Sequence, residues 1–289
     1  MRVFVTGGTG FTGSRLVPLL LKNQYQVRGL RRPASDRSSL PGDLPEIEWV
    51  EGDLSDARVL ASAMRGTDAL MNVASLGFGH ADAVIRAAQE AGIRRALFIG
   101  STAIFTRLDA TSKKIRVEAE LAIEASGLQY TLLRPTMIYG SPRDRNMWRL
   151  IRLMRYSPVV PVFGDGNSLQ QPIHVEDVAQ AVVSCLSREQ TVCKSYNIAG
   201  RHPLTYNEVI DTIARQMNRQ VRKIHIPFRP VVSALALFER LRLPTPLKAE
   251  QILRLNEDKS FRYEDAQRDF GFRPLTFEEG IKLELNSSS

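Results

Sequence analysis

Three glycines near the start of the sequence have the type and spacing needed to bind a dinucleotide. Residues 6–13 read TGGTGFTG, so Gly7, Gly10 and Gly13 form a G-x-x-G-x-x-G pattern. Glycine lets the backbone turn sharply and approach a pyrophosphate closely, and free N–H groups at the start of the next helix bind the phosphate charge. The alternative is a glycine-rich turn that binds nothing. The residues between the glycines are predicted to line the same site: Thr9, Phe11 and Thr12.

Two arginines indicate which dinucleotide would bind. Arg31 and Arg32 end the second expected strand, where an NAD-specific site carries an acidic residue for the ribose 2′-hydroxyl. A guanidinium is instead a bidentate partner for a 2′-phosphate. The pattern therefore favours NADP(H), although NAD(H) stays an option and both arginines could be solvated loop residues.

Strand and helix patterns alternate around these residues and must position the site. Apolar and β-branched runs predict strands at residues 2–5, 26–30, 47–51, 69–73, 95–100 and 130–134. Helical patterns are expected between them, with leucines after Gly13 and further helices at 57–64, 81–91 and 117–125. This alternation indicates βαβ units and a parallel sheet covered by helices on both faces.

The pattern loosens after Gly140. Helices are expected at 145–155, 175–186, 207–217, 230–240 and 277–285 and strands at 195–199 and 224–226, whereas Pro158, Pro161 and the glycines at 164–166 should break the chain. We therefore predict an α/β protein with a Rossmann-like doubly wound parallel sheet at residues 1–140 and a smaller mixed α/β C-terminal substrate lobe at 141–286. The lobe should be interleaved with the sheet rather than form an independent domain.

Composition narrows the class of protein. Of the 289 residues, 43% are hydrophobic, and no apolar run approaches the roughly 18 residues that cross a bilayer. The first strand leaves no room for a signal peptide, and Cys185 and Cys193 make no disulfide framework. A cytoplasmic protein with reduced, buried thiols is therefore expected. The net charge of +8 comes from scattered arginines, which would steer a polyanionic ligand without forming a nucleic-acid site.

Several further motifs follow in the order typical of one family. They are Gly52-Asp53-Leu54, Asn72-Val73-Ala74, Ser101-Thr102, the stretch from Arg134-Pro135 to Tyr139-Gly140, and IHVEDVA at residues 173–179. Together with TGGTGFTG they resemble the short-chain dehydrogenase/reductase (SDR) superfamily, in its extended or atypical branches. The resemblance implies further cofactor contacts from Asp53, Leu54, Val73, Ala74, Ser75, Arg134, Pro135 and Thr136. At the first of these motifs, helix capping by Asp53 or Ser55 is the alternative.

Two segments of the C-terminal half indicate which branch of the superfamily the sequence resembles. The segments YNIAG at 196–200 and LTYNE at 204–208 resemble the nucleotide-diphosphate-sugar epimerases and their atypical relatives, which include the NAD(P)H-binding accessory subunit of respiratory complex I. This implies a small-molecule substrate, a carbonyl compound or a nucleotide-linked sugar, in the cleft between the lobes. It also implies pairing into a homodimer through the helices after the fourth and fifth strands.

The residues that catalyse proton transfer in this family are replaced here. Active SDR enzymes carry Tyr-x-x-x-Lys on the helix after the fifth strand, and the tyrosine exchanges a proton with the substrate oxygen. Counted without gaps from Arg134, Ser112 falls at the tyrosine position and Arg116 at the lysine position. Arginine can hold ribose hydroxyls through its several donors, but a serine hydroxyl is far less acidic than a phenol. Ser101 falls at the family's catalytic serine position.

Three replacements for the tyrosine are conceivable. Tyr139 comes near the expected nicotinamide end, Lys113 or Lys114 could act alone, and His174 could carry a proton near neutral pH. Each has a structural alternative: a packed aromatic ring, solvated lysines at a helix start, and a capping or core histidine. The predicted catalytic set is Ser101, Ser112, Arg116 and Tyr139.

Two hypotheses of different classes remain. The first, slightly favoured, is an NADP(H)-dependent oxidoreductase or epimerase-like enzyme. The second is a non-catalytic NAD(P)H-binding redox sensor or assembly partner, as the loss of the Tyr-x-x-x-Lys pair would allow. A weak peripheral association with a membrane is a further option, because the helix expected at 230–240 has apolar residues flanked by Arg229 and Arg240. Such a helix more often covers the substrate lobe.

Overall fold

A seven-stranded parallel sheet forms the body of the protein. The computed structural model describes residues 1–33, 47–144, 146–245 and 248–286, and within them the strand order is β11-β6-β5-β4-β1-β2-β3. The strands are β1 (Arg2–Thr6), β2 (Gln26–Arg31), β3 (Ile47–Glu51), β4 (Ala69–Asn72), β5 (Arg95–Ile99), β6 (Gln129–Pro135) and β11 (Lys194–Ile198). The order changes direction between β1 and β4, and ligands of such sheets bind beyond the carboxyl ends of the strands at that point. The predicted Rossmann-like fold is confirmed.

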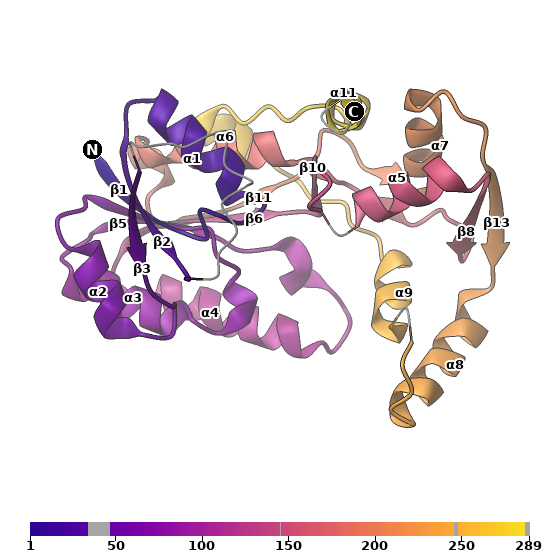
Figure 1. The fold of residues 1–289 in the computed structure, drawn as a ribbon, viewed down its shortest axis with the longest axis horizontal. Coiled ribbons are helices and arrows are strands. Elements are labelled where there is room, and N and C mark those ends of the chain that lie inside the picture. The colour runs from indigo at the N-terminus through magenta and orange to yellow at the C-terminus, as the bar shows by residue number, and fades with distance from the viewer. Residues whose placement is uncertain (34–46, 145, 246–247, 287–289) are drawn as a thin grey trace.

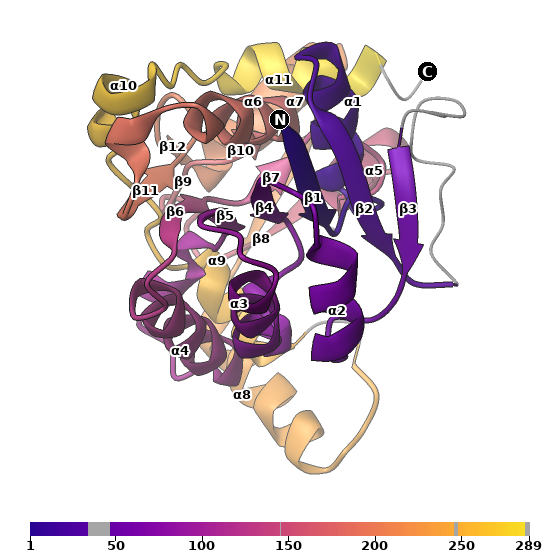
Figure 2. The same cartoon turned by 90° about the vertical axis from the view of Figure 1, so that its left-hand side faces the viewer.

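Helices cover both faces of this sheet (Figures 1 and 2). On one face lie α1 (Gly13–Lys22) and α6 (Val175–Leu186), and on the other lie α2 (Ala57–Met64), α3 (Ala81–Glu90) and α4 (Thr111–Glu124). The alternation of side chains along β1 explains both layers. Val3 and Val5 share an apolar cluster with Leu16 of α1, whereas Phe4 shares one with Leu60 of α2.

The C-terminal lobe is built from short strands and helices around a core of its own. Three two-stranded sheets pair β7 (Ile138–Tyr139) with β10 (Ile173–His174), β9 (Leu169–Gln170) with β12 (Leu204–Thr205), and β8 (Val159–Phe163) with β13 (Arg222–Ile226). The helices of this half are α5 (Met147–Tyr156), α7 (Tyr206–Gln216), α8 (Phe228–Arg240), α9 (Ala249–Leu255), α10 (Glu264–Phe270) and α11 (Phe277–Asn286). An apolar cluster joins α5, β8, α7 and α11.

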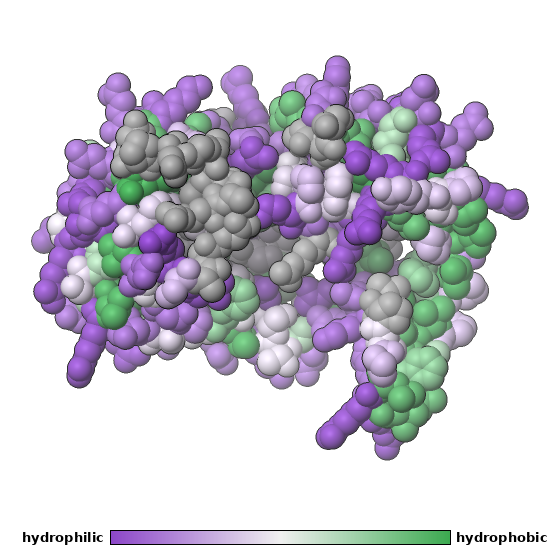
Figure 3. All heavy atoms as spheres, in the orientation of Figure 1, coloured by the Kyte–Doolittle hydropathy of each residue, from purple (hydrophilic) through white to green (hydrophobic). Residues whose placement is uncertain are grey.

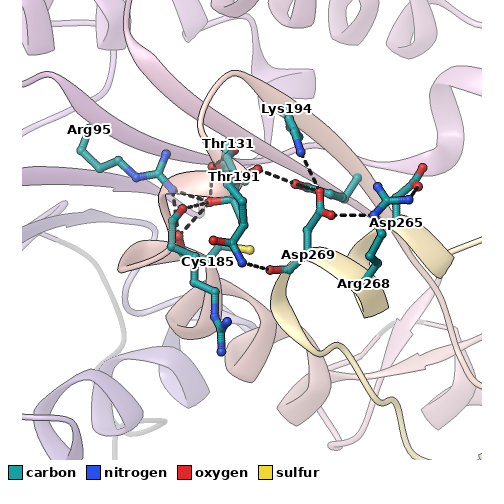
Figure 4. Close-up of polar contacts among 11 residues, drawn as sticks. Arg95, Thr131, Cys185, Thr191, Lys194, Asp265, Arg268 and Asp269 are labelled. Atoms are coloured by element: carbon teal, nitrogen blue, oxygen red, sulfur yellow. Dashed lines mark hydrogen bonds and ion pairs between the residues drawn. The ribbon is translucent and has the colours of Figure 1, made fainter.

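Part of the C-terminal half returns to the main sheet. β11 pairs with β6 in parallel, and the polar contacts in Figure 4 tie it to the body. Arg95 of β5 donates to the carbonyl of Cys185 and to the hydroxyl of Thr191, while Lys194 of β11 pairs with Asp269 of α10 at 2.8 Å. The boundary at residue 140 stays a prediction.

Two predictions about this half are wrong. Pro161 does not break the chain but lies inside β8, opposite Ile224 of β13. A strand with one partner has an unpaired edge, and a proline nitrogen facing that edge forfeits no hydrogen bond. Cys193 is exposed, whereas Cys185 is buried as expected. The helix expected from 145 begins at Met147, and Arg145 lies outside the described residues.

Candidate cofactor and active site

The three glycines of the first turn differ in what surrounds them. A Cβ at Gly7, whose φ is +69°, would lie 2.7 Å from the amide nitrogen of Ala74, and a Cβ at Gly13 would overlap the carbonyl oxygen of Gly7. At Gly10 that oxygen would be 3.0 Å away, and the described residues leave the remaining directions open. Gly7 and Gly13 therefore close the turn, while Gly10 leaves space where a ligand could approach the backbone.

The start of α1 lies directly behind this open glycine. Its N-cap residue, Thr12, makes no side-chain capping hydrogen bond, and the Ser14 hydroxyl turns back to the carbonyl of Phe11. The first N–H groups of a helix lack partners within the helix and carry partial positive charge. This end of α1 therefore fits a phosphate.

The ends of β1 and β4 are tied together beside the turn. The Thr6 hydroxyl bonds to the Asn72 side chain at 2.7 Å, and the Asn72 amide donates to the carbonyl of Ala74. These bonds hold residues 73–75 against Gly7, where Val73 and Ala74 are partly exposed and Ser75 is exposed. The predicted cofactor residues of these two segments thus lie side by side.

Arg143 is a residue that the sequence analysis missed. It follows β7 in the C-terminal half, is exposed, and donates from Nη2 to the carbonyl of Thr9 at 3.3 Å. Its guanidinium therefore lies against the glycine turn, where it could pair with a phosphate. The glycine motif does not indicate Arg143, because Arg143 lies far from residues 6–13 in the sequence.

Arg31 and Arg32 have different surroundings at the end of β2. Arg31 pairs with Glu51 of the neighbouring β3 at 2.7 Å and is partly buried. Arg32 is exposed, and its charge is one of the smaller influences that lower the pKa of Asp53, after the hydrogen bonds from Ser55. Arg32 is thus the more exposed of the two side chains.

The turn around Asp53 precedes α2 without capping it. The Asp53 carboxylate accepts from the backbone and hydroxyl of Ser55, while Asp56 is the residue that caps α2 through the N–H groups of Arg58 and Val59. The alternative of capping by Asp53 or Ser55 is therefore wrong. Asp53 is exposed and Leu54 partly exposed, as the predicted cofactor contact requires.

Ser101 and the residues of the Arg134-Pro135 motif meet at the ends of β5 and β6. Ser101 is partly exposed and accepts from the N–H of Ala103, and the Thr102 hydroxyl donates to the carbonyl of Pro135 at 3.3 Å. Thr136 is buried, and its hydroxyl donates to the carbonyl of Gln171. Ser101 is the hydroxyl of this group that a substrate could reach.

Arg134 points toward α4 rather than toward the glycine turn. Its guanidinium bonds to the buried carboxylate of Glu120 at 2.8 Å and lies over the ring of Phe105. Burial raises the pKa of Glu120, and Arg134 counteracts this. An unpaired buried charge is costly, so this pair fixes α4 against β6. The predicted cofactor contact of Arg134 would have to come from the rest of its side chain.

The residues at the Tyr and Lys positions lie together on α4. Arg116 donates from Nη1 to the carbonyl of Ser112 at 2.9 Å, and a Cβ at Gly77 would lie 2.9 Å from the Arg116 guanidinium carbon. Arg116 therefore covers the segment that follows β4, next to residues 73–75. Of the two candidate lysines, Lys113 donates to the carbonyl of Thr106 and Lys114 pairs with Asp109.

Tyr139 does not fit the catalytic role predicted for it. Its side chain is 1% exposed, packs against His174 and Phe277, and touches the backbone of Gly280 in α11. Burial raises its pKa well above the ordinary value, so the phenol holds its proton. The alternative interpretation, a packed aromatic ring, describes it correctly.

His174 is likewise a structural residue. It caps α6 by accepting from the N–H of Glu176, and burial followed by the charge of Arg15 lowers its pKa to about 4. The imidazole is therefore neutral at pH 7 and cannot supply a proton from its cationic form.

Of two charged residues after α9, Glu257 contacts the segment that follows Ser101, whereas Lys259 bonds within the C-terminal lobe. Glu257 accepts from the hydroxyl of Thr106 and the N–H of Arg107, and Lys259 donates to Gln170 of β9. Burial lowers the pKa of Lys259 to about 8. Glu257 thus joins the segment after β5 to the C-terminal lobe.

Comparison with known proteins identifies the family. A family model described as NAD(P)H-binding matches residues 7–189, which is more than half of the chain. The chain belongs to this family. More broadly, it is a member of the extended or atypical SDR superfamily.

Individual relatives differ in what their names say. The ceramide reductase of Caulobacter vibrioides is 31% identical over 82% of this chain and 77% of its own length. The mitochondrial NADH dehydrogenase [ubiquinone] 1 alpha subcomplex subunit 9 of Arabidopsis thaliana is 27% identical over 88% of this chain and 67% of its own. A dTDP-glucose 4,6-dehydratase structure from Streptomyces venezuelae, with NAD bound, shares the fold at a TM-score of 0.77, with 20% identity over 99% of this chain and 96% of that one.

Proposed function

We propose that this member of the NAD(P)H-binding family is an NADP(H)-dependent oxidoreductase or epimerase-like enzyme that acts on a small carbonyl or sugar-nucleotide substrate. The observation that carries the proposal is the open side of Gly10 in front of α1. Arg143 on one side of this turn and Arg32 at the end of β2 add positive charge for phosphates. Reductase activity is the form we favour, because the relative with the highest identity among those compared above is named a reductase.

Each residue of the site has a proposed task. Arg116 would hold the nicotinamide ribose through its guanidinium, and Ser101 with Ser112 would orient the substrate oxygen. NADPH supplies the hydride when it is bound. The proton that completes the reduction would come from water ordered by these hydroxyls, since Tyr139 is enclosed in the core. Loss of a dedicated general acid costs about 10²–10⁴-fold in rate, so slow turnover is expected.

The experiment is a measurement of NADPH oxidation with a panel of ketones, lipid carbonyls and sugar nucleotides. The Ser101→Ala variant is the test of the site, and the exposed Ser62 of α2 gives a control variant, Ser62→Ala. We expect turnover that falls at least tenfold in the first variant and stays unchanged in the second.

The non-catalytic alternative is favoured by a specific observation, the serine at the tyrosine position combined with the buried Tyr139. Tight NADPH binding without turnover of any compound in the panel would overturn the enzyme proposal and leave the sensor or assembly partner in its place.

A further inference from the structure

Helix α8 stands apart from the rest of the protein. It projects from the C-terminal lobe together with α9, and its surface is largely apolar (Figures 1 and 3). Every residue of α8 is at least partly exposed. α8 has 13 residues and six large apolar side chains, yet none of its residues is buried. A helix of this composition normally buries one face.

The helix has two apolar faces, and one of them is covered. Val232 and Leu235 are half-buried and share a helix face with Glu239, which accepts from the N–H of Ala249 in α9. A second stripe continues from the helix into the residues after it and faces outward. Its large members are exposed by 55% at Leu237, 43% at Phe238, 60% at Leu241 and 49% at Leu243.

Basic residues border this outward stripe. Arg229, Arg240 and Arg242 are exposed, and Lys248 follows at the start of α9. The one acidic residue between positions 227 and 248 is Glu239, and it engages the start of α9. The stripe therefore lies within a local excess of positive charge, on a chain whose net charge is +8.

We propose that the outward stripe, residues Leu237, Phe238, Leu241 and Leu243 with Arg229, Arg240 and Arg242, docks on an anionic lipid surface. An amphipathic helix with a basic border binds in the plane of such a surface, where its apolar side chains enter the acyl boundary and its arginines meet the headgroups. A two-fold contact with a second copy would instead bring like-charged borders together, because the same patch faces itself. The charge thus favours lipid over self-association.

This inference is independent of the proposed catalytic function. A protein that binds the lipid surface and turns nothing over would still satisfy it, and an active enzyme that stays off vesicles would overturn it.

The test is flotation of the protein with vesicles of phosphatidylcholine alone and of phosphatidylcholine mixed with phosphatidylglycerol. We expect binding to the mixed vesicles that exceeds binding to the neutral ones at least tenfold and falls with added salt. The double variant Leu237→Asp with Leu241→Asp should lose this binding, and Arg229→Ala with Arg240→Ala should lose its preference for the anionic vesicles. Leu121→Asp is the matched control, because Leu121 of α4 is exposed by 60%, as Leu241 is, and should bind like the unmodified protein.

Two further measurements make the outcome decisive. NADPH affinity and the thermal midpoint should be unchanged in the Leu237→Asp, Leu241→Asp variant, because both side chains are more than half exposed. Light scattering after gel filtration reports the mass in solution. A dimer that the same variant converts to a monomer, or equal vesicle binding by this variant and the Leu121→Asp control, would overturn the proposal.

Discussion

Two neighbouring arginines at the end of β2 differ in exposure and surroundings. Arg31 engages Glu51 on β3, while Arg32 is exposed toward Asp53. Arg32 is the more exposed of the two side chains, so a ligand phosphate can reach it more easily. Arg32 should therefore contribute more to the choice between NADPH and NADH than Arg31.

We predict that replacing both arginines with alanine weakens NADPH binding at least tenfold more than NADH binding, because a charge-assisted hydrogen bond contributes about 1.5–3 kcal/mol. The single variants Arg32→Ala and Arg31→Ala separate the two contributions, and most of the loss should appear in the first. Isothermal titration with both cofactors measures this. Equal weakening of the two cofactors would place the 2′-phosphate elsewhere.

The proposed roles of Ser112 and Arg116 can be tested by restoring the family's tyrosine and lysine at these positions. If these residues occupy the positions of the missing tyrosine and lysine, Ser112→Tyr combined with Arg116→Lys should raise the rate of NADPH-dependent turnover, by up to about 10²–10⁴-fold for a returned general acid. Tyr139→Phe should leave turnover unchanged, since that ring is in the core. A rate that the restored pair does not raise, together with a loss in Tyr139→Phe, would contradict this assignment.

Among the elements, α5 and α11 are joined by two buried carboxyl groups. Asp144 accepts from the N–H groups of Asn146 and Met147 at the start of α5, and Glu284 of α11 bonds to it. Burial, and then the charge of Asp144, raises the pKa of Glu284 to about 9. Glu284 is thus protonated at pH 7 and donates to the Asp144 carboxylate.

This pair makes stability depend on pH in a definite direction. Because the folded protein holds a proton that the unfolded chain releases near pH 4.5, the contribution is fully present below pH 4.5 and is lost as the pH rises toward 9. The free energy of unfolding should fall across this window by up to about 1.4 kcal/mol per pH unit. Glu284→Gln keeps a donor toward Asp144 and should flatten the slope, while Glu278→Gln, exposed on the same helix, should not. Urea unfolding between pH 5 and 9 checks this, and parallel slopes for all three proteins would contradict it.

Local patterns predicted the elements of the main sheet well. Strand β3 and helices α2 and α6 begin and end at the expected residues, because each has a regular apolar pattern that is bounded by turn residues. The short elements α9 and α10 were missed, since seven residues hold too few helical repeats to be recognised. β8 was not predicted, because Pro161 favours a break in a strand that is paired on both sides. Among the described residues β8 pairs with β13, and the sequence alone does not show this arrangement.

At the scale of the whole molecule, the site depends on contacts that no local pattern contains. Tyr139 follows a family motif, yet Gly280, far along the chain in α11, packs against its hydroxyl and encloses it. Arg143 reaches the glycine turn from the C-terminal half in the same way. The glycine turn itself was predictable, because a strand, the glycines and a helix are consecutive in the sequence and form one local unit.

If a dinucleotide binds where Gly10 leaves the turn open, the Gly10→Asp variant should lose its affinity for NADPH, which a titration measures. The backbone at Gly10 is not in the left-handed region, so the variant should fold, while its carboxylate fills and charges the space intended for the pyrophosphate. Asn23→Asp adds the same charge at the other end of α1 and is the control. We predict that the unmodified protein and Asn23→Asp bind NADPH and that Gly10→Asp does not. A folded Gly10→Asp variant with unchanged NADPH affinity would show that the dinucleotide does not bind at this turn.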